Sequence, residues 1–271
     1  MIDMLHYQFM QHALLAGVLG GISCALAGVW MVTMGIPFLG VTMSHAAFAG
    51  ALAGLLVGVD PFVSALVFCL VSSLLIGPVS DAAEFKADTA VGIIFSCMLG
   101  LAFLFMAKIP GAKTQALSLI WGSILTVSSR DVLVIAASCA VVLALVSIFF
   151  KEIQAVLFSR EIAASVGIPE KAVYYALLFV CGGVIAANLT TIGGLLIFSL
   201  VINPAAAAYQ LAFSLKAMYV YAAVFGVLSC MLGLLISYWF DVPAGAVIII
   251  SSSAIFFCAL VCSPKKKHKA R

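Results

Sequence analysis

The stretch "GVTMSHAAFAGALAGLLVG", residues 40 to 58, contains one histidine, His45, among residues that are otherwise small or apolar. No Asp, Glu, Lys or Arg occurs between Asp3 and Asp60. An apolar run of about 20 residues has the length that crosses the hydrocarbon core of a bilayer as a helix. The stretch therefore predicts a membrane-spanning helix that carries a titratable ring.

The composition of the whole chain agrees with a membrane environment. Of 271 residues, 65% are hydrophobic and 8% are charged, whereas about a quarter of an ordinary soluble domain is charged. The charged residues lie between apolar runs, which avoids the cost of several kcal/mol for a charge at mid-bilayer. The short alternating strands of a membrane barrel are absent from the sequence. We expect an all-α fold, a polytopic membrane helical bundle that forms a single domain over residues 1–271.

The apolar runs predict up to nine spans. Their approximate bounds are 11–33, 38–59, 61–80, 89–107, 131–150, 172–189, 192–214, 217–239 and 243–262. Nine crossings place the amino terminus outside; eight, with one segment re-entrant or lying in the interface, place both termini inside. Residues 1–12, "MIDMLHYQFMQH", are amphipathic enough to lie along the interface. Residues 108–130 are interpreted either as a surface connection or as a re-entrant helix at the entrance.

The basic residues give an orientation. The tail at residues 263–271, "SPKKKHKAR", follows the last span directly and predicts a cytoplasmic carboxyl terminus. Counting back places residues 81–88, residues 151–171 and Lys216 on the cytoplasmic side. Residues 108–130 then face outward, although they carry three basic residues. The eight cysteines are dispersed through the apolar runs without a CxxC pair, so we interpret them as small packing residues.

The connection at residues 151–171 contains a short amphipathic helix at about residues 153–167. Apolar residues recur in it at helical spacing, and Gly167 followed by Ile168 and Pro169 predicts its end. Such a helix is either an interfacial connector or a coupling helix that docks on a cytoplasmic partner.

Five motifs, taken in order, resemble the permease subunits of ATP-binding cassette importers for zinc, manganese and iron. They are "MSHAAFAG" (43–50), "FKADTAVGIIFS" (85–96), "ALSLIWGSILTVSSRDV" (116–132), "FSREIAASVGI" (158–168) and "TTIGGLLIFSLVINPAAAA" (190–208). The resemblance covers nearly the whole chain. It implies a bacterial-type cytoplasmic membrane and an assembly with a second permease copy, identical or sister, a cytoplasmic ATPase dimer and an extracytoplasmic metal-binding protein. No nucleic-acid partner is expected.

The resemblance also assigns a coupling role to the cytoplasmic connection. The residues implied to contact the ATPase are Phe158, Ser159, Arg160, Glu161 and Gly167. This favours the docking interpretation of the short helix over the connector.

A nucleotide site of the chain's own is not expected. A phosphate-cradling loop needs GxxxxGK followed by Ser or Thr, and the nearest stretch, "GAKT" at residues 111–114, lacks the first glycine. The chain is therefore predicted to be no enzyme and to bind no permanent cofactor. ATP is expected on a partner subunit, and the divalent metal ion is the cargo.

His45 is the candidate metal ligand. A neutral imidazole suits zinc, iron and copper, and an intramembrane ionisable group is a site hypothesis by default. The alternative is a hydrogen bond between helices. Gly50, Gly54 and Gly58 form a small-residue stripe that favours close helix packing, and His45 lies beside it. Ser44 and His45 also match the serine and histidine of the family pattern, which implies a translocation path here.

One position departs from that pattern. The family has an aspartate four residues before the histidine, where this chain has Val41. A second wall of the path is sought at Asn203, because Pro204 removes a helix hydrogen bond and frees a backbone carbonyl. A structural kink with Asn203 bridging helices is the alternative.

The main functional alternative is a self-sufficient secondary transporter or channel for a metal ion or small solute. That class normally carries acidic residues within the membrane for ion coupling, and the interiors of the predicted spans contain none. The sequence leaves the identity of the metal open.

Overall fold

The computed structural model describes residues 8–84, 86–109 and 127–265, and every regular element in these ranges is an α-helix. The helices are α1 (Gln8–Thr33), α2 (Leu39–Val57), α3 (Pro61–Ala82), α4 (Ala87–Lys108), α6 (Ser129–Ile148), α7 (Phe150–Phe158), α8 (Arg160–Ser165), α9 (Glu170–Ile192), α10 (Gly194–Leu211), α11 (Leu215–Phe240) and α12 (Ala244–Val261). The predicted all-α polytopic bundle is confirmed.

Each of the nine predicted spans corresponds to one long helix. Eight helices of the described ranges are long and apolar enough to cross a membrane, namely α1, α2, α3, α4, α6, α9, α11 and α12. The ninth, α10, has 18 residues, which at about 1.5 Å per residue give about 27 Å, close to the hydrocarbon thickness. Most of the suggested re-entrant segment at 108–130, and residues 1–7 of the suggested interfacial segment, lie outside the described residues.

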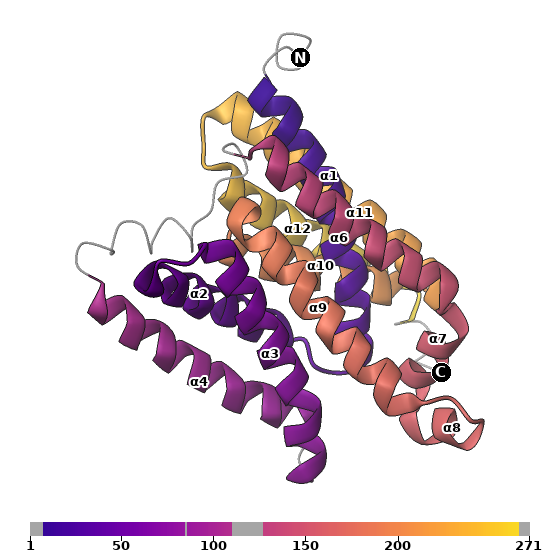
Figure 1. Ribbon diagram of the computed structural model, residues 1–271. Coiled ribbons are helices and arrows are strands. Elements are labelled where there is room, and N and C mark those ends of the chain that lie inside the picture. Colours follow the sequence, from indigo (N-terminus) through magenta and orange to yellow (C-terminus); the bar gives the residue numbers. More distant parts are fainter. Residues whose placement is uncertain (1–7, 85, 110–126, 266–271) are drawn as a thin grey trace.

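The helices form two groups (Figure 1). One contains α2, α3 and α4, which pack on one another; the other contains α1, α10, α11 and α12. Between them lies α9, which contacts α3, α2, α6 and α1. This arrangement places the interior face of α2 against α9 and α10.

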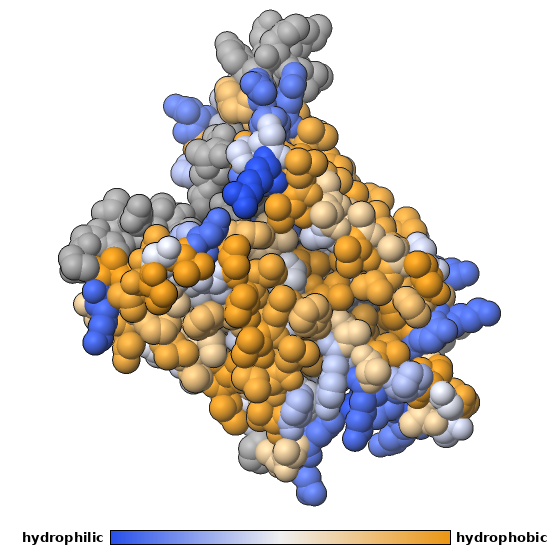
Figure 2. All heavy atoms as spheres, viewed as in Figure 1, coloured by the Kyte–Doolittle hydropathy of each residue, from blue (hydrophilic) through white to orange (hydrophobic). Residues whose placement is uncertain are grey.

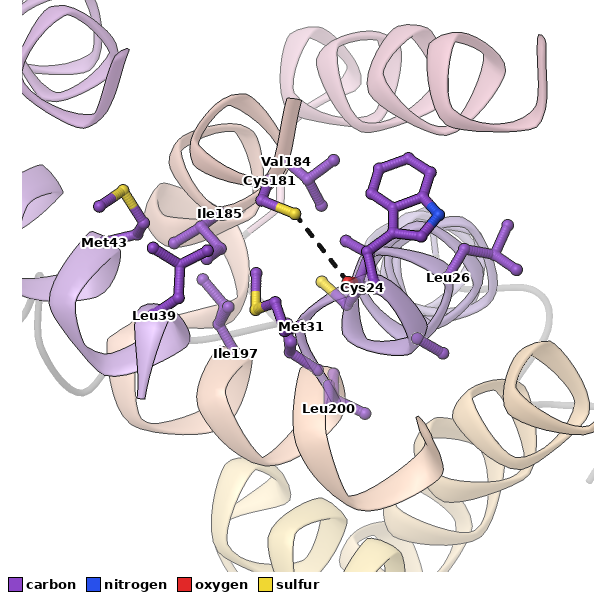
Figure 3. Close-up of a cluster of buried hydrophobic side chains, with 14 of the residues drawn as sticks. Cys24, Leu26, Met31, Leu39, Met43, Cys181, Val184, Ile185, Ile197 and Leu200 are labelled. Carbon is purple, nitrogen blue, oxygen red and sulfur yellow. Dashed lines mark hydrogen bonds between the residues drawn. The ribbon is translucent and has the colours of Figure 1, made fainter. Parts of the chain in front are cut away.

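The core lies where α1, α2, α9 and α10 meet (Figure 3). Its buried side chains include Cys24, Leu26, Met31, Leu39, Met43, Cys181, Val184, Ile185, Ile197 and Leu200. The thiol of Cys181 donates a weak hydrogen bond to the carbonyl of Ala27 at 3.9 Å. The buried cysteines therefore pack between helices, as expected from their dispersed positions.

Glycine allows α1 to approach its neighbours closely. A Cβ at Gly28 would lie 1.8 Å from the carbonyl oxygen of Val201 on α10, and one at Gly21 would lie 2.9 Å from the backbone of Gly226 on α11. Close backbone approach through small residues is the main source of helix association in lipid. These two contacts fix α1 against α10 and α11.

The two ends of the bundle can be told apart by contacts. At the end that contains α7 and α8, Lys216 lies over the ring of Phe150 at 5.4 Å, and the segment after α12 reaches the end of α10. At the opposite end, His12 near the start of α1 lies 3.4 Å from Ser129 at the start of α6. The chain therefore enters α1 at one end and leaves α12 at the other, which requires an odd number of crossings and favours nine.

The segment after α12 also covers the last carbonyl groups of α10. Ser263 donates a hydrogen bond to the carbonyl of Gln210 at 2.9 Å. The amine of Lys265 donates to the carbonyl of Tyr209 and lies 4.2 Å from the centroid of its ring. A helix end leaves such carbonyls without intrahelical partners, and the two donors satisfy them.

The surface is apolar across the middle. Figure 2 shows hydrophobic residues over the centre of the face and hydrophilic residues gathered toward its ends. Large exposed apolar side chains come from several spans and include Val67, Val71, Leu104, Leu133 and Val220. A surface of this kind is stable against lipid and costly in water.

Candidate functional site

His45 lines a partly open cavity between helices. The cavity has a volume of about 230 Å³ and lies between α2, α4, α10 and the end of α9. Its lining consists of Val41, Ser44, His45, Phe48, Leu99, Phe103, Met106, Leu189, Gly194 and Phe198. His45 therefore borders a space between helices that is partly open to the surface, where Phe103 is exposed. At about 30 Å³ per liquid water, the space is about that of eight water molecules, enough for an ion with part of its hydration shell.

The ring of His45 is fixed in one tautomer. Its Nδ1 lies 3.0 Å from the carbonyl oxygen of Val41, one turn earlier on α2. A carbonyl can only accept, so Nδ1 donates, and in the neutral ring Nε2 keeps its lone pair. Phe95 of α4 holds the ring edge-on, with 5.0 Å between ring centroids and 78° between planes. Such an imidazole is prepared to accept a proton or a metal ion at Nε2.

The other polar group of the cavity is the hydroxyl of Ser44. It is buried and donates to the carbonyl of Gly40 at 2.9 Å, which leaves its oxygen lone pairs for a ligand. Val41 also lines the cavity, so the side chain one turn before His45 faces the same space but offers only methyl groups. No set of three His, Cys, Asp or Glu side chains suited to a metal is found within the described residues.

Asn203 does not line this cavity. Its Nδ2 lies 3.0 Å from each of three hydroxyl oxygens, those of Ser199 on α10 and of Ser252 and Ser253 on α12. Ser252 and Ser253 donate their own protons to the carbonyl of Ile249, so both accept from the amide. The structure thus separates Asn203 from His45 and ties it to α12. The serines lie about 50 residues further along the chain, beyond the reach of local sequence patterns.

The three glycines of the α2 stripe have two different roles. A Cβ at Gly50 would lie 2.5 Å from the carbonyl oxygen of Ser64, and one at Gly54 would lie 2.9 Å from its hydroxyl. These two glycines bring α2 against α3. Gly58 instead ends α2 in a left-handed conformation with φ 77°, with no neighbouring atom within 4 Å of a Cβ position. The packing role expected for Gly58 is therefore a capping role.

The connection at residues 150–167 contains two helices where the sequence predicted one. Ser159 is extended, with φ −161° and ψ 124°, and separates α7 from α8. Its hydroxyl accepts a hydrogen bond from the N–H of Ile162 at 3.3 Å, as an N-cap does. A serine that bonds to the backbone two or three residues on starts a new helix more readily than it continues an old one. Gly167 ends the segment with φ 82°.

Arg160 points back into the protein. Its Nε donates to Glu170 at the start of α9 at 2.7 Å, and its Nη1 lies 3.5 Å from Asp81 near the end of α3. The guanidinium also lies 4.5 Å from the centroid of the Tyr174 ring. Burial lowers the pKa of Arg160, but the hydrogen bond and charge of Glu170 and the charge of Asp81 raise it above its ordinary value. Arg160 is therefore a permanent cation held between two spanning helices.

The outward face of this end is apolar. Phe158 is 80% exposed, Ile162 52% and Val166 66%, and we call these three side chains the α8 apolar patch. Glu161 is exposed beside them. The family resemblance implied an ATPase contact for Phe158 but not for Ile162 or Val166. The signal for these two residues was their four-residue spacing within an amphipathic segment. Large exposed apolar groups gathered in one place mark a surface that another protein or a membrane covers.

Comparisons with known proteins agree with this geometry. The model of the ABC 3 transport family matches residues 6–263. The manganese transport system membrane protein MntC of Halalkalibacterium halodurans is 31% identical over 97% of this chain and 90% of its own length. The manganese import system permease protein ScaB of Streptococcus gordonii is 30% identical over 98% and 95%, respectively.

A solved structure extends the similarity to three dimensions. It is that of PsaBC from Streptococcus pneumoniae in complex with a Fab, with a TM-score of 0.86, 30% sequence identity, and coverage of 98% of this chain and 96% of the other. The match runs from the first span through the cavity helices to the last. This chain belongs to the ABC 3 transport family.

Proposed function

We propose that the chain is the permease subunit of an ATP-driven importer and forms the membrane path for a divalent transition metal ion. The observation that carries this is His45, whose ring is fixed with Nε2 as acceptor inside a cavity between spanning helices. An imidazole and a few waters hold an ion weakly, and a path must release its ion as well as bind it. The relatives named for manganese transport support a metal cargo.

The proposed path contains His45 and Ser44 as its polar groups. One chain offers a single imidazole, so further ligands are waters or come from a second permease copy, as expected for a paired assembly. Asn203 is retained in the proposal as the residue that fixes α10, one wall of the cavity, and not as a ligand.

The ATPase is proposed to dock at the end that contains α7 and α8. Its contacts are the α8 apolar patch and the exposed Glu161, while Ser159 and Gly167 shape the segment and Arg160 anchors it. The described Lys and Arg residues at this end are Lys86, Lys151, Arg160, Lys171, Lys216 and Lys265; those at the opposite end are Lys108 and Arg130. This bias supports a cytoplasmic position for the α7–α8 end and for the carboxyl terminus. A capture protein outside the membrane then delivers metal to the other end.

Proteoliposomes distinguish this proposal from a self-sufficient transporter. The chain is reconstituted alone and with its ATPase and capture protein, and uptake of radioactive manganese, iron and zinc is followed with and without ATP. We expect uptake only from the complete assembly with ATP. Uptake by the chain alone, driven by a gradient, contradicts the proposal. In the described spans the acidic residues Asp81, Asp88, Asp131 and Glu170 stand only in terminal turns, which also speaks against proton or sodium coupling.

The same assay tests the cavity. His45→Ala is expected to lower uptake about tenfold or more, as loss of a metal-site group commonly does, with a normal amount of assembled protein. His12→Ala, at the far end of α1 and away from the cavity, is the matched control. Equal uptake by the His45→Ala and His12→Ala variants assigns His45 a purely structural role.

A further inference from the structure

Asp81 makes contacts that join three helices. One of its carboxylate oxygens, Oδ1, lies 3.5 Å from Nη1 of Arg160 on α8. The other, Oδ2, accepts a hydrogen bond of 2.7 Å from the hydroxyl of Tyr175 on α9. Arg160 in turn donates to Glu170 at the start of α9. Each oxygen of Asp81 thus has its own partner, and the last turn of α3 is attached to both α8 and α9.

The contact between α3 and α9 continues along both helices, away from Asp81. The ring of Tyr175 lies so close over Gly77, one turn earlier on α3, that a Cβ there would come within 2.1 Å of it. Further along the same pair, a Cβ at Gly182 of α9 would lie 3.1 Å from the carbonyl of Cys69. Because these surfaces are closely packed, α3 and α9 transmit a displacement with little deformation.

From α3 the contacts lead to the cavity. Gly50 and Gly54 bring α2 against Ser64, and the thiol of Cys69 donates a hydrogen bond of 3.2 Å to the carbonyl of Met43. Met43 stands two residues before His45 on α2. A movement of the end of α3 therefore reaches the helix that carries His45.

We propose that Asp81 is a positioning residue of the transport cycle: it links α8, where the ATPase docks, to the α2–α3 pair that carries the wall of the cavity. The inference rests on the proposed function. It assigns Arg160 to this internal link, and assigns binding of the ATPase to the α8 apolar patch. The side chains of Arg160 and Asp81 are 33% and 32% exposed, and ion pairs so accessible to water add little to folding stability. Removal of the link should therefore uncouple the transporter without unfolding it.

The test compares variants of the complete assembly in proteoliposomes. The readouts are metal ions imported per ATP hydrolysed and the amount of ATPase that copurifies with the permease. Asp81→Asn keeps an acceptor for Tyr175 and removes the charge that faces Arg160. We expect it to lower the import ratio at least about fivefold, the lower range of measured coupling between sites, with unchanged ATPase copurification. Asp81→Glu should restore part of the ratio. Glu84→Gln, three residues further along and just past the end of α3, is the matched control, because Glu84 is exposed and has no ion pair among the described residues.

A double variant shows that the two residues act through each other. If Asp81 works through Arg160, Asp81→Asn combined with Arg160→Gln lowers the import ratio no further than Arg160→Gln alone. A wild-type ratio for Asp81→Asn, or loss of ATPase from that variant, overturns this inference and leaves the proposed function intact. Absence of ATP-driven metal import in the wild-type assembly overturns the proposed function, and this inference with it.

Discussion

The hydrogen bond from His45 to the carbonyl of Val41 decides the chemistry of the imidazole. It uses Nδ1, so the remaining nitrogen is the acceptor, and it holds the ring against Phe95. The sequence predicted an imidazole within a span beside a small-residue stripe. It did not predict the tautomer, because that depends on which ring nitrogen meets the carbonyl one turn earlier.

Val41 is expected to limit the affinity of the cavity for harder ions. Its side chain lines the cavity next to His45, and at i and i+4 two side chains share one helical face. Carboxylate oxygen suits manganese, whereas imidazole suits zinc and iron. Val41→Asp is therefore expected to raise manganese uptake relative to zinc uptake by about tenfold, the size of effect common for groups around a metal site.

The measurement is competitive uptake of the two ions by the complete assembly. The capture protein is the same in both assemblies, so a change in the ratio reports the permease. Val41→Asn, with a neutral side chain of similar shape, should change the ratio less. An unchanged ratio in the Val41→Asp variant places the selective step outside this cavity.

At the scale of the element, α8 shows how one residue changes a helix. A continuous amphipathic helix over residues 153–167 was predicted, because apolar residues recur with the helical period. Ser159 interrupts it by capping α8, and the interruption turns Arg160 inward and leaves Ile162 and Val166 exposed. The helical period of the apolar residues was enough to predict that the segment exists. The inward direction of Arg160 could not be predicted in this way, because it depends on Asp81 and Glu170, which lie in other helices.

The α8 apolar patch predicts a measurable interface. Replacement of Ile162 and Val166 together by serine should weaken ATPase binding by about tenfold or more, equivalent to about 1.4 kcal/mol, because exposed apolar anchors carry much of an interface's affinity. Both side chains are largely exposed, so the thermal midpoint of the purified permease should not change. Titration of the detergent-purified permease with its ATPase gives the affinity. Val242→Ser, at the opposite end, serves as the control, and equal affinities for the two proteins exclude α8 as the docking site.

Asn203 holds α10 and α12 together at the point where Pro204 interrupts the helix hydrogen bonds of α10. Asn203→Leu removes the hydrogen bonds that the amide donates to the hydroxyls of Ser252 and Ser253, and each such bond contributes about 0.5–1.5 kcal/mol to stability. We expect a lower thermal midpoint and an unchanged preference among metal ions. Thermal unfolding in detergent and competitive uptake test the two parts. A stable variant with altered metal preference would indicate that Asn203 is part of the translocation path.

For the whole molecule, hydropathy was enough to find the spans. All nine predicted runs correspond to long helices, since a 30 Å hydrocarbon layer fixes their length and excludes charge. The arrangement of α2–α4 beside α1 and α10–α12 could not be predicted in the same way, because it depends on close approaches such as Gly28 to Val201. Small residues occur throughout the chain, and the pattern does not say which pairs meet.

The odd number of crossings predicts the side of the amino terminus. With the α7–α8 end in the cytoplasm, as proposed, α1 begins outside. An epitope placed before residue 1 should be cleaved by a protease added to intact spheroplasts, and one placed at the carboxyl terminus only after lysis. Protection of both epitopes in intact spheroplasts indicates eight crossings.

The cover over the end of α10 bears on how the protein can be handled. Ser263 and Lys265 supply the last carbonyls of that helix with donors. An affinity tag or fluorescent reporter spliced directly after residue 262 removes both donors and weakens the end of α10, which forms one wall of the cavity. A fusion joined downstream of residue 265 through a flexible spacer keeps them, so that placement is the one to choose for purification and imaging.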